Sequence, residues 1–272
     1  MDRLMVVTTE QSSDSIVLKH AAGWARELSC RFEPDKMRIR ELQEQHKDGS
    51  NLLIIVVGRE RTRLLLGGRA YYFHPNMAKL RLQNLVRGEM DQFVQATGLE
   101  KGSSLLDCTL GLGADAIVAS HVAGPEGRVV GLECTPVLGM LVKEGFSKYN
   151  GLKGNRQNPV LQQALVEAMR RITVNISDSF EYLSKLQDCS FDIIYFDPMF
   201  RHTREQSSAM DLLRMLGSNQ PLTTSLLDQA RRVAAKRVVV KERRGSSVFK
   251  ELGIGCVAGG KYSSVAYGII EK

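Results

Sequence analysis

From about residue 104 onward, short apolar runs alternate with longer amphipathic stretches. The strand-like runs cover residues 104–108, 128–133, 171–176, 191–196 and 237–241. Helix-like patterns between them cover residues 114–122, 136–149, 160–169, 205–216 and 223–235. Because the strands are apolar almost throughout, they predict a parallel sheet covered by helices on both faces. Residues 255–259 and 262–271, separated by Gly260-Lys261, predict an antiparallel hairpin that completes the sheet.

The N-terminal part of the chain has a different pattern. Residues 5–8 predict a strand and residues 13–28 predict an amphipathic helix, which a charged stretch follows as far as Gln45. Two β-rich runs, at residues 52–57 and 63–73, are separated by a polar turn and predict a hairpin. This part resembles a small α/β unit that is separate from the longer series of strands and helices.

The pattern also predicts where the two parts meet. After His74-Pro75-Asn76, one long helix is predicted to run to about Thr97, where Gly98 ends it. We therefore expect a small N-terminal α/β domain over residues 1–73. Residues 74–272 are expected to form an α/β domain with a doubly wound, mostly parallel sheet and an antiparallel C-terminal hairpin.

Composition excludes several classes of protein. The 272 residues are 43% hydrophobic and 25% charged, the balance of a chain with a real core. The longest aliphatic run, residues 52–57, is far shorter than the roughly 20 residues of a membrane span, and the N-terminus lacks a secretory pattern. The five cysteines form no CxxC pair and have no metal spacing with histidine. We expect a cytoplasmic protein with reduced thiols and no bound metal; its oligomeric state stays open.

The net charge of +7 favours a polyanionic partner, although a solvated basic surface is the plain alternative. Basic residues gather at Lys241, Arg243 and Arg244, a group that begins at the carboxyl end of an apolar strand. The carboxyl end of a parallel strand is where such sheets bind their substrates. These three residues are therefore candidates for contact with nucleic-acid phosphates.

A glycine-bearing turn joins the first strand of the large domain to its first helix. Gly111 and Gly113 allow a sharp turn and close approach of a ligand to the backbone, and the helix that begins near Ala114 offers unpaired N–H groups. Glu133 ends the next strand, 22 residues after Gly111, where a carboxylate can accept ribose hydroxyl protons. This spacing fits both NAD and S-adenosylmethionine, and a tight turn without a ligand is a third possibility.

Two further features favour S-adenosylmethionine over NAD. Asp107 stands just before the turn, where its carboxylate can order the loop and meet an ammonium group. Ser177 and Asp178 follow the third strand, where polar side chains can bond an adenine amino group. Each of these residues is also common as a plain turn or capping residue.

A second loop, Asp197-Pro198-Met199-Phe200, follows an apolar strand and suits methylation of an amine on a planar base. The Asp197 carboxylate and the Pro198 carbonyl can accept the amine N–H groups, and Phe200 can stack on a base taken out of its helix. Catalysis of this kind depends on positioning and electrostatics more than on a strong base. A turn with a capping aspartate and a core phenylalanine is the alternative.

Together these motifs resemble class I S-adenosylmethionine-dependent methyltransferases, and within them the ribosomal RNA small subunit methyltransferase J family. The resemblance is carried by Arg87-Gly88-Glu89, the segment from Asp107 to Asp115, Glu133, Asp197-Pro198-Met199-Phe200 and the segment from Ala235 to Lys241. It implies a Rossmann-like methyltransferase fold, and N2 methylation of a guanosine in small-subunit rRNA. The partner that it implies is rRNA or the small ribosomal subunit.

The resemblance also implies a set of site residues. Cofactor contacts are expected at Asp107, Gly111, Gly113, Ala114, Asp115, Glu133, Cys134, Ser177, Asp178 and Asp197. Ala114 and Cys134 stand where the family usually has arginine, and Arg201, a further candidate for substrate binding, stands where it usually has proline. A methyltransferase for another RNA site, a small molecule or a protein remains an alternative, as do an NAD-linked oxidoreductase and a non-catalytic RNA-binding factor.

Overall fold

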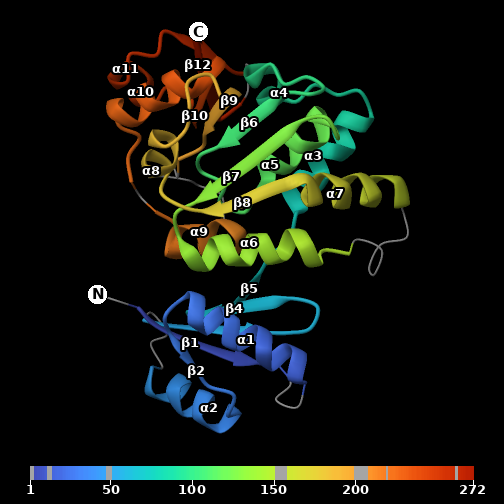
Figure 1. The fold of residues 1–272 in the computed structure, drawn as a ribbon, viewed down its shortest axis with the longest axis vertical. Coiled ribbons are helices and arrows are strands. Elements are labelled where there is room, and N and C mark those ends of the chain that lie inside the picture. Colours follow the sequence, from blue (N-terminus) through green and yellow to red (C-terminus); the bar gives the residue numbers. More distant parts are fainter. Residues whose placement is uncertain are drawn as a thin grey trace. The chain divides into compact units, whose positions relative to one another are not determined.

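The computed structural model describes residues 3–10, 14–46, 51–150, 158–198, 208–218, 220–260 and 263–272. The chain divides into two compact units, Met1–His74 and Pro75–Lys272 (Figure 1). We refer to them as the N-terminal unit and the C-terminal unit and describe each by itself.

The N-terminal unit contains a five-stranded sheet in the order β2-β1-β3-β4-β5. Its strands are β1 (Leu4–Thr9), β2 (Arg31–Phe32), β3 (Leu52–Val57), β4 (Thr62–Leu66) and β5 (Arg69–Tyr72). β1 pairs in parallel with both β2 and β3, whereas β3, β4 and β5 form an antiparallel meander. The helices α1 (Ser15–Glu27) and α2 (Lys36–Gln45) begin after Asp14 and Asp35, whose side chains accept backbone N–H groups of the first turn.

Two details of this unit differ from the prediction. The run at residues 63–73 forms two strands because Gly67 and Gly68, with φ of 57° and 71°, make a tight turn within it. The charged stretch before Gln45 contains α2, whose residue Ile39 packs against Val6, Ile54 and Val56. Leu42, three residues after Ile39, packs against the same cluster, and the charged and polar residues around these two hid the helix from a search for hydrophobic periodicity.

The C-terminal unit contains a seven-stranded sheet in the order β11-β12-β10-β9-β6-β7-β8. Its strands are β6 (Ser104–Asp107), β7 (Arg128–Glu133), β8 (Ile172–Ile176), β9 (Phe191–Phe196), β10 (Ala234–Arg243), β11 (Cys256–Ala258) and β12 (Val265–Glu271). β10, β9, β6, β7 and β8 are parallel, and β12 lies antiparallel between β10 and β11. The predicted doubly wound sheet with a reversed C-terminal hairpin is confirmed.

Helices cover both faces of this sheet (Figure 1). They are α3 (Asn76–Val86), α4 (Gln92–Thr97), α5 (Ala114–Ala123), α6 (Pro136–Lys148), α7 (Pro159–Arg171), α8 (Ser179–Ser184), α9 (Ser208–Leu216), α10 (Thr224–Val233) and α11 (Val248–Glu251). Successive residues of a strand point to opposite faces. Accordingly Phe196 packs in one core layer with α8, α10 and α11, whereas the Tyr195 ring lies 4.8 Å from the Phe93 ring of α4.

The single helix predicted from residue 77 to Thr97 is wrong, because the structure has two helices there. α3 ends at Val86 and Gly88 adopts φ of 81°, a left-handed conformation that breaks a helix. Asp91 then caps α4, and its carboxylate accepts N–H groups from Phe93 at 3.0 Å and Val94 at 3.2 Å. The break gives α3 an orientation of its own.

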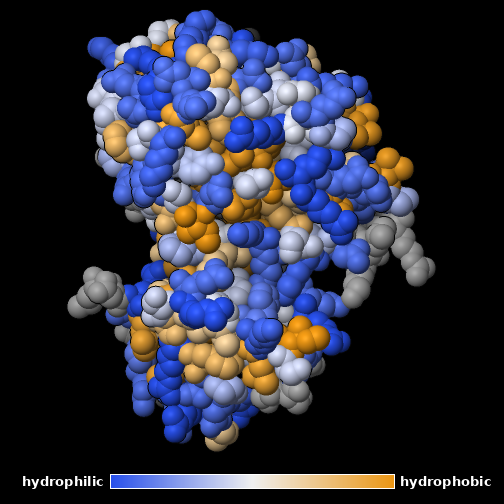
Figure 2. Space-filling view, viewed as in Figure 1, coloured by the Kyte–Doolittle hydropathy of each residue, from blue (hydrophilic) through white to orange (hydrophobic). Residues whose placement is uncertain are grey.

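Polar residues cover much of the visible surface of each unit, with hydrophobic residues in patches among them (Figure 2). Across the described segments, no helix combines the length and the apolar character that crossing a membrane requires.

Candidate active site

The two loops singled out in the sequence lie side by side, at the carboxyl ends of the neighbouring strands β6 and β9. The backbone N–H of Asp197 donates to the Thr109 hydroxyl at 2.5 Å, and that of Cys108 donates to the Tyr195 carbonyl at 2.9 Å. The chain leaves β6 toward β7 on one side and reaches β9 on the other. This reversal of strand order is where open α/β sheets bind ligands.

The glycine turn depends on backbone conformations and close contacts that other residues tolerate poorly. Gly111 and Gly113 have φ of 52° and 76°. A Cβ atom at Gly113 would lie 2.5 Å from the Phe146 ring, so the turn packs against α6 only because a side chain is absent. α5 begins at the next residue, Ala114, and its first N–H groups therefore lie at this turn.

Glu133, at the end of β7, joins the glycine turn to the neighbouring strands. Its carboxylate accepts the Gly111 N–H at 3.1 Å and the Thr135 N–H at 2.9 Å, and its carbonyl oxygen accepts the Ser177 N–H at 3.1 Å. The side chain is buried, and burial raises the pKa of the carboxyl group despite these backbone donors. Cys134, the next residue, is exposed.

Asp178 has a structural role in addition to its predicted contact with the cofactor. It is the N-cap of α8, and its carboxylate accepts the Glu181 N–H at 3.0 Å. The Ser177 hydroxyl donates to the Asp178 carbonyl at 3.2 Å. Contact of either residue with adenine stays a prediction.

Asp197 forms an ion pair with Lys241. In the parallel register of β9 and β10, Val240 pairs with Phe196, so Lys241 and Asp197 follow at the same edge of the sheet. The Lys241 ammonium lies 2.7 Å from one Asp197 oxygen and 3.2 Å from an oxygen of Asp115. Within the protein, the charge of Lys241 binds two carboxylates; contact of Lys241 with a substrate phosphate stays a prediction.

Asp115 is the centre of this network. Its carboxylate forms ion pairs with Lys241 and Arg81. It also accepts a hydrogen bond from the Tyr195 hydroxyl, with 2.8 Å between the two oxygens. Burial would raise the pKa of Asp115, but the Lys241 and Arg81 cations outweigh it and hold the pKa well below the usual range. The structure shows Asp115 in an internal network of ion pairs and a hydrogen bond; the predicted contact of Asp115 with the cofactor stays a prediction.

Sequence reasoning missed Arg81. Its guanidinium, on α3, also bonds the two Asp91 oxygens at 2.7 Å and 2.9 Å and lies 5.3 Å from the centre of the Phe93 ring. The break between α3 and α4 allows one arginine to reach both the α4 cap and the first turn of α5.

The two remaining aspartates of the site hold their protons more tightly than usual. Burial is the largest cause of the rise in the pKa of Asp197 to about 6, because it outweighs the Lys241 cation, and the neighbouring Asp115 adds to the rise. Asp107 is buried and accepts the Thr109 N–H at 3.0 Å. Burial raises its pKa well above the usual range, and the charges of Asp115 and Asp197 raise it further.

The charges at this edge of the sheet fit a cationic cofactor. Two cations, Arg81 and Lys241, face four carboxylates at the loops: Asp107, Asp115, Glu133 and Asp197. The pyrophosphate of NAD would favour the protonated form of these carboxyl groups, whereas a bound ammonium or sulfonium group, as in S-adenosylmethionine, favours their ionised form. When bound, that cofactor supplies an electrophilic methyl group.

The family model described as "Putative SAM-dependent methyltransferase" matches residues 68–262. The chain belongs to the SAM-dependent methyltransferase family. This membership and the charge of the site identify S-adenosylmethionine (SAM) as the cofactor of this methyltransferase, as predicted, and the NAD alternative is dropped.

Two individual proteins and a solved structure are similar to this chain, and the second protein and the structure have methyltransferase names. The methyltransferase is 35% identical over 268 residues to YpiP of Bacillus subtilis (strain 168), covering 98% of this chain and 99% of that protein. It is 32% identical over 193 residues to the ribosomal RNA small subunit methyltransferase J of Dechloromonas aromatica (strain RCB), covering 69% and 72%. The crystal structure of the SAM-dependent methyltransferase NGO1261 from Neisseria gonorrhoeae has the same fold, with a TM-score of 0.63 at 17% identity over 98% of this chain and 95% of that one.

The loop that was predicted to contact the substrate continues through Met199, Phe200 and Arg201, which lie outside the described residues. Pro198 is described and half-buried. Arg243 and Arg244 are exposed at the end of β10, where the Arg244 guanidinium donates to the Gly260 carbonyl at 2.8 Å. Contact of these residues with a substrate stays a prediction.

We predict that Gly113→Ala destabilises the methyltransferase by about 3 kcal/mol, from a strained left-handed backbone plus overlap with Phe146. Gly102→Ala is the matched control, because Gly102 also has a positive φ, of 81°, but a Cβ there meets no atom within 4 Å. This control is expected to lose about 1 kcal/mol. Urea unfolding measures both values, and equal losses would show that the Phe146 contact is unimportant.

We also predict that Arg81→Gln lowers the free energy of unfolding at pH 7 by about 3 kcal/mol, because it leaves Asp91 without its cation and the buried Asp115 with Lys241 alone. Arg87→Gln removes the same charge from the exposed C-terminal end of α3 and should change stability by less than about 0.5 kcal/mol. Urea unfolding of both variants tests the difference. If Arg81→Gln left the free energy of unfolding unchanged, the result would contradict a stabilising role for the network.

Proposed function

We propose that this methyltransferase methylates an exocyclic amine of an RNA base, namely N2 of a guanine in small-subunit rRNA, in the cytoplasm. The observation that carries the proposal is the position of Asp197. Its carboxylate lies at the loop hydrogen-bonded to the glycine turn, in an ion pair with Lys241. An amine bound by this carboxylate would be next to the cofactor loop.

The chemistry of an exocyclic amine explains why such a carboxylate is useful. The nitrogen lone pair is delocalised into the base ring, so the amine is a poor nucleophile. Hydrogen bonds from its N–H groups to Asp197 and to the Pro198 carbonyl would favour the localised lone pair. Lys241 holds the carboxylate in place, so that most of the rate enhancement comes from orientation and preorganised charge.

Three observations support RNA as the substrate. The Dechloromonas aromatica relative is named for small-subunit rRNA, and its similarity covers 69% of this chain. The net charge is +7. Arg243 and Arg244 are exposed at the same sheet edge as Asp197, where they can contact the phosphates that flank a target base.

We predict that kcat/KM for SAM in the methyl-transfer reaction rises with pH around pH 6 and is constant above about pH 7. The reason is that only the ionised Asp197 accepts amine N–H groups, and its pKa is raised to about 6. The pH profile of kcat is measured with the cofactor bound, and its rise should lie at lower pH. The reason is that the sulfonium cation of SAM favours the ionised form of Asp197. Initial rates between pH 5 and pH 9 test both expectations.

Asp197→Asn separates this role from cofactor binding. The variant is expected to lose at least about 100-fold in kcat, and the limb near pH 6, while SAM binding weakens by at most about tenfold. Calorimetry measures the binding. Asp192→Asn is the matched control, because Asp192 is on the same strand but bonds Ser104 and Lys236, away from the loops. Unchanged turnover of Asp197→Asn would contradict the proposal.

The substrate is tested with labelled SAM and three pools: small ribosomal subunits from cells that lack this protein, the naked rRNA extracted from them, and the metabolites of the same cells. We expect label in one guanine of the small-subunit rRNA and, after digestion to nucleosides, in N2-methylguanosine. Label on another RNA position would overturn the guanine assignment. Label only in metabolites or protein would overturn an RNA substrate altogether.

A further inference from the structure

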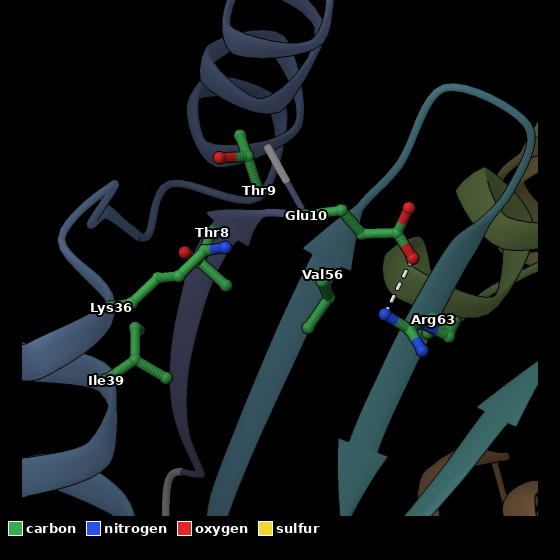
Figure 3. A pocket seen from close by; sticks show the side chains of 7 residues that line it. All are labelled: Thr8, Thr9, Glu10, Lys36, Ile39, Val56 and Arg63. Atoms are coloured by element: carbon green, nitrogen blue, oxygen red, sulfur yellow. Dashed lines mark ion pairs between the residues drawn. The ribbon is translucent and has the colours of Figure 1, made fainter. Parts of the chain in front are cut away.

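The N-terminal unit contains a hollow of about 340 Å³ at the carboxyl ends of its parallel strands (Figure 3). Small-molecule sites have volumes of ~300–1,000 Å³, so this hollow has room for more than a single ion. Every residue that lines it belongs to the N-terminal unit: Thr8, Thr9, Glu10, Lys36, Ile39, Val56 and Arg63.

Its place in the sheet is one where ligands commonly bind. The chain leaves β1 through α1 to reach β2 on one side, then crosses through α2 to reach β3 on the other side of β1. The strand order therefore reverses between β1 and β3, and the hollow lies at the carboxyl ends of these two strands. Open α/β sheets bind ligands at such a reversal.

The strand register brings polar groups together there. Thr8 pairs with Val56, and Val56 pairs with Arg63, so these three side chains form a row on one face of the sheet. Ile39 of α2 packs against the same face. Thr9 is the next residue of β1, and Figure 3 shows its side chain projecting in another direction from that of Thr8.

Several polar atoms of this hollow have no protein partner. Thr8 and Thr9 are 4% and 2% exposed, and within the described part of the chain neither hydroxyl makes a hydrogen bond. The Arg63 Nε atom is likewise buried without a partner among those residues. Buried polar groups nearly always have partners, because leaving them unpaired is costly. A ligand that bonds these groups would remove the cost.

The charges of the hollow favour an anion. One terminal nitrogen of Arg63 forms an ion pair with Glu10 at 2.6 Å, which neutralises that carboxylate. Glu10 lies close to Gly58, where a Cβ atom would be only 2.5 Å from its carboxylate. Lys36, the first residue of α2, extends toward Thr8 in Figure 3 and leaves the lining with a net positive charge.

We propose that this hollow binds the phosphate group of a small phosphorylated molecule. Lys36, Arg63 Nε and the Thr8 hydroxyl are donors of the kind that phosphate oxygens accept, and the Thr9 hydroxyl is a further unpartnered donor at the end of β1. The remaining volume accommodates a hydroxyl-bearing part of the ligand, for which the Glu10 carboxylate is an acceptor.

The test uses the full chain with threonine methyl groups labelled for NMR, titrated with inorganic phosphate and with ribose 5-phosphate. Ribose 5-phosphate carries no adenine and therefore does not imitate the cofactor of the C-terminal unit. The Thr8 and Thr9 signals should shift and saturate, while the signal of Thr97, a buried threonine of α4, should stay in place. Sodium acetate at equal ionic strength, and a 5′-hydroxyl RNA oligonucleotide, are the comparison ligands.

Variants then assign the binding to these residues. Lys36→Gln and Thr8→Val should each weaken ribose 5-phosphate binding at least fivefold. Arg40→Gln, which removes an exposed cation from the same helix away from the hollow, should change binding less than twofold. Thr8→Val should leave the melting temperature of the ligand-free protein unchanged or raised, since it removes an unpaired hydroxyl.

Three outcomes would overturn the proposal: no shift at Thr8 and Thr9 with either phosphate compound, equal shifts with acetate, or binding that the Lys36 and Thr8 variants leave intact. Saturation by the oligonucleotide alone would also overturn it, because the site would then belong to an RNA surface. None of these outcomes bears on methyl transfer, which is measured separately at the C-terminal unit.

Discussion

The Lys241 ammonium connects two carboxylates that the chain supplies from separate loops, and the geometry of the active edge depends on this contact. Asp115 stands in the first turn of α5 and Asp197 follows β9, so like charges meet where the two loops adjoin. Without a cation between them, these partly desolvated carboxylates would repel each other or take up protons. Lys241 allows both loops to lie close together with Asp197 still able to ionise near neutral pH.

Charge is distributed unevenly within this edge. Arg81 and Lys241 both pair with Asp115, in the first turn of α5. Among the described residues, Asp107 and Glu133 form no ion pair and are held by backbone N–H groups instead. The protein thus uses its cations to secure the framework. It leaves carboxylates beside the glycine turn for a positively charged cofactor.

Local signals in the sequence were sufficient for the C-terminal sheet. Buried parallel strands are short apolar runs, and the glycines at 111 and 113 mark the turn after β6 because the backbone there adopts positive φ. Arg81 gave no such signal. It bonds Asp115, 34 residues further along the chain, and this contact depends on the end of the helix near Gly88. The helix α2 was missed for a different reason, since its core contacts come from Ile39 and Leu42 among charged and polar neighbours.

The pairing of Lys241 with Asp197 was, by contrast, within reach of the sequence. Asp197 follows β9 and Lys241 lies near the carboxyl end of β10; consecutive strands of a parallel sheet are commonly neighbours, so their carboxyl ends meet. Residues 199–201 are outside the described segments, and the roles assigned to Phe200 and Arg201 therefore rest on the sequence alone.

The position of β12 has a consequence for how the protein is made. Residues 265–271 follow every other strand in chain order, yet they lie inside the sheet, between β10 and β11. While the nascent chain emerges, β10 has an unpaired hydrogen-bonding edge that other chains can join. Lys241 is on β10 and pairs with Tyr267 of β12, so the strand that carries the active-site lysine has both of its neighbours only once β12 has been made.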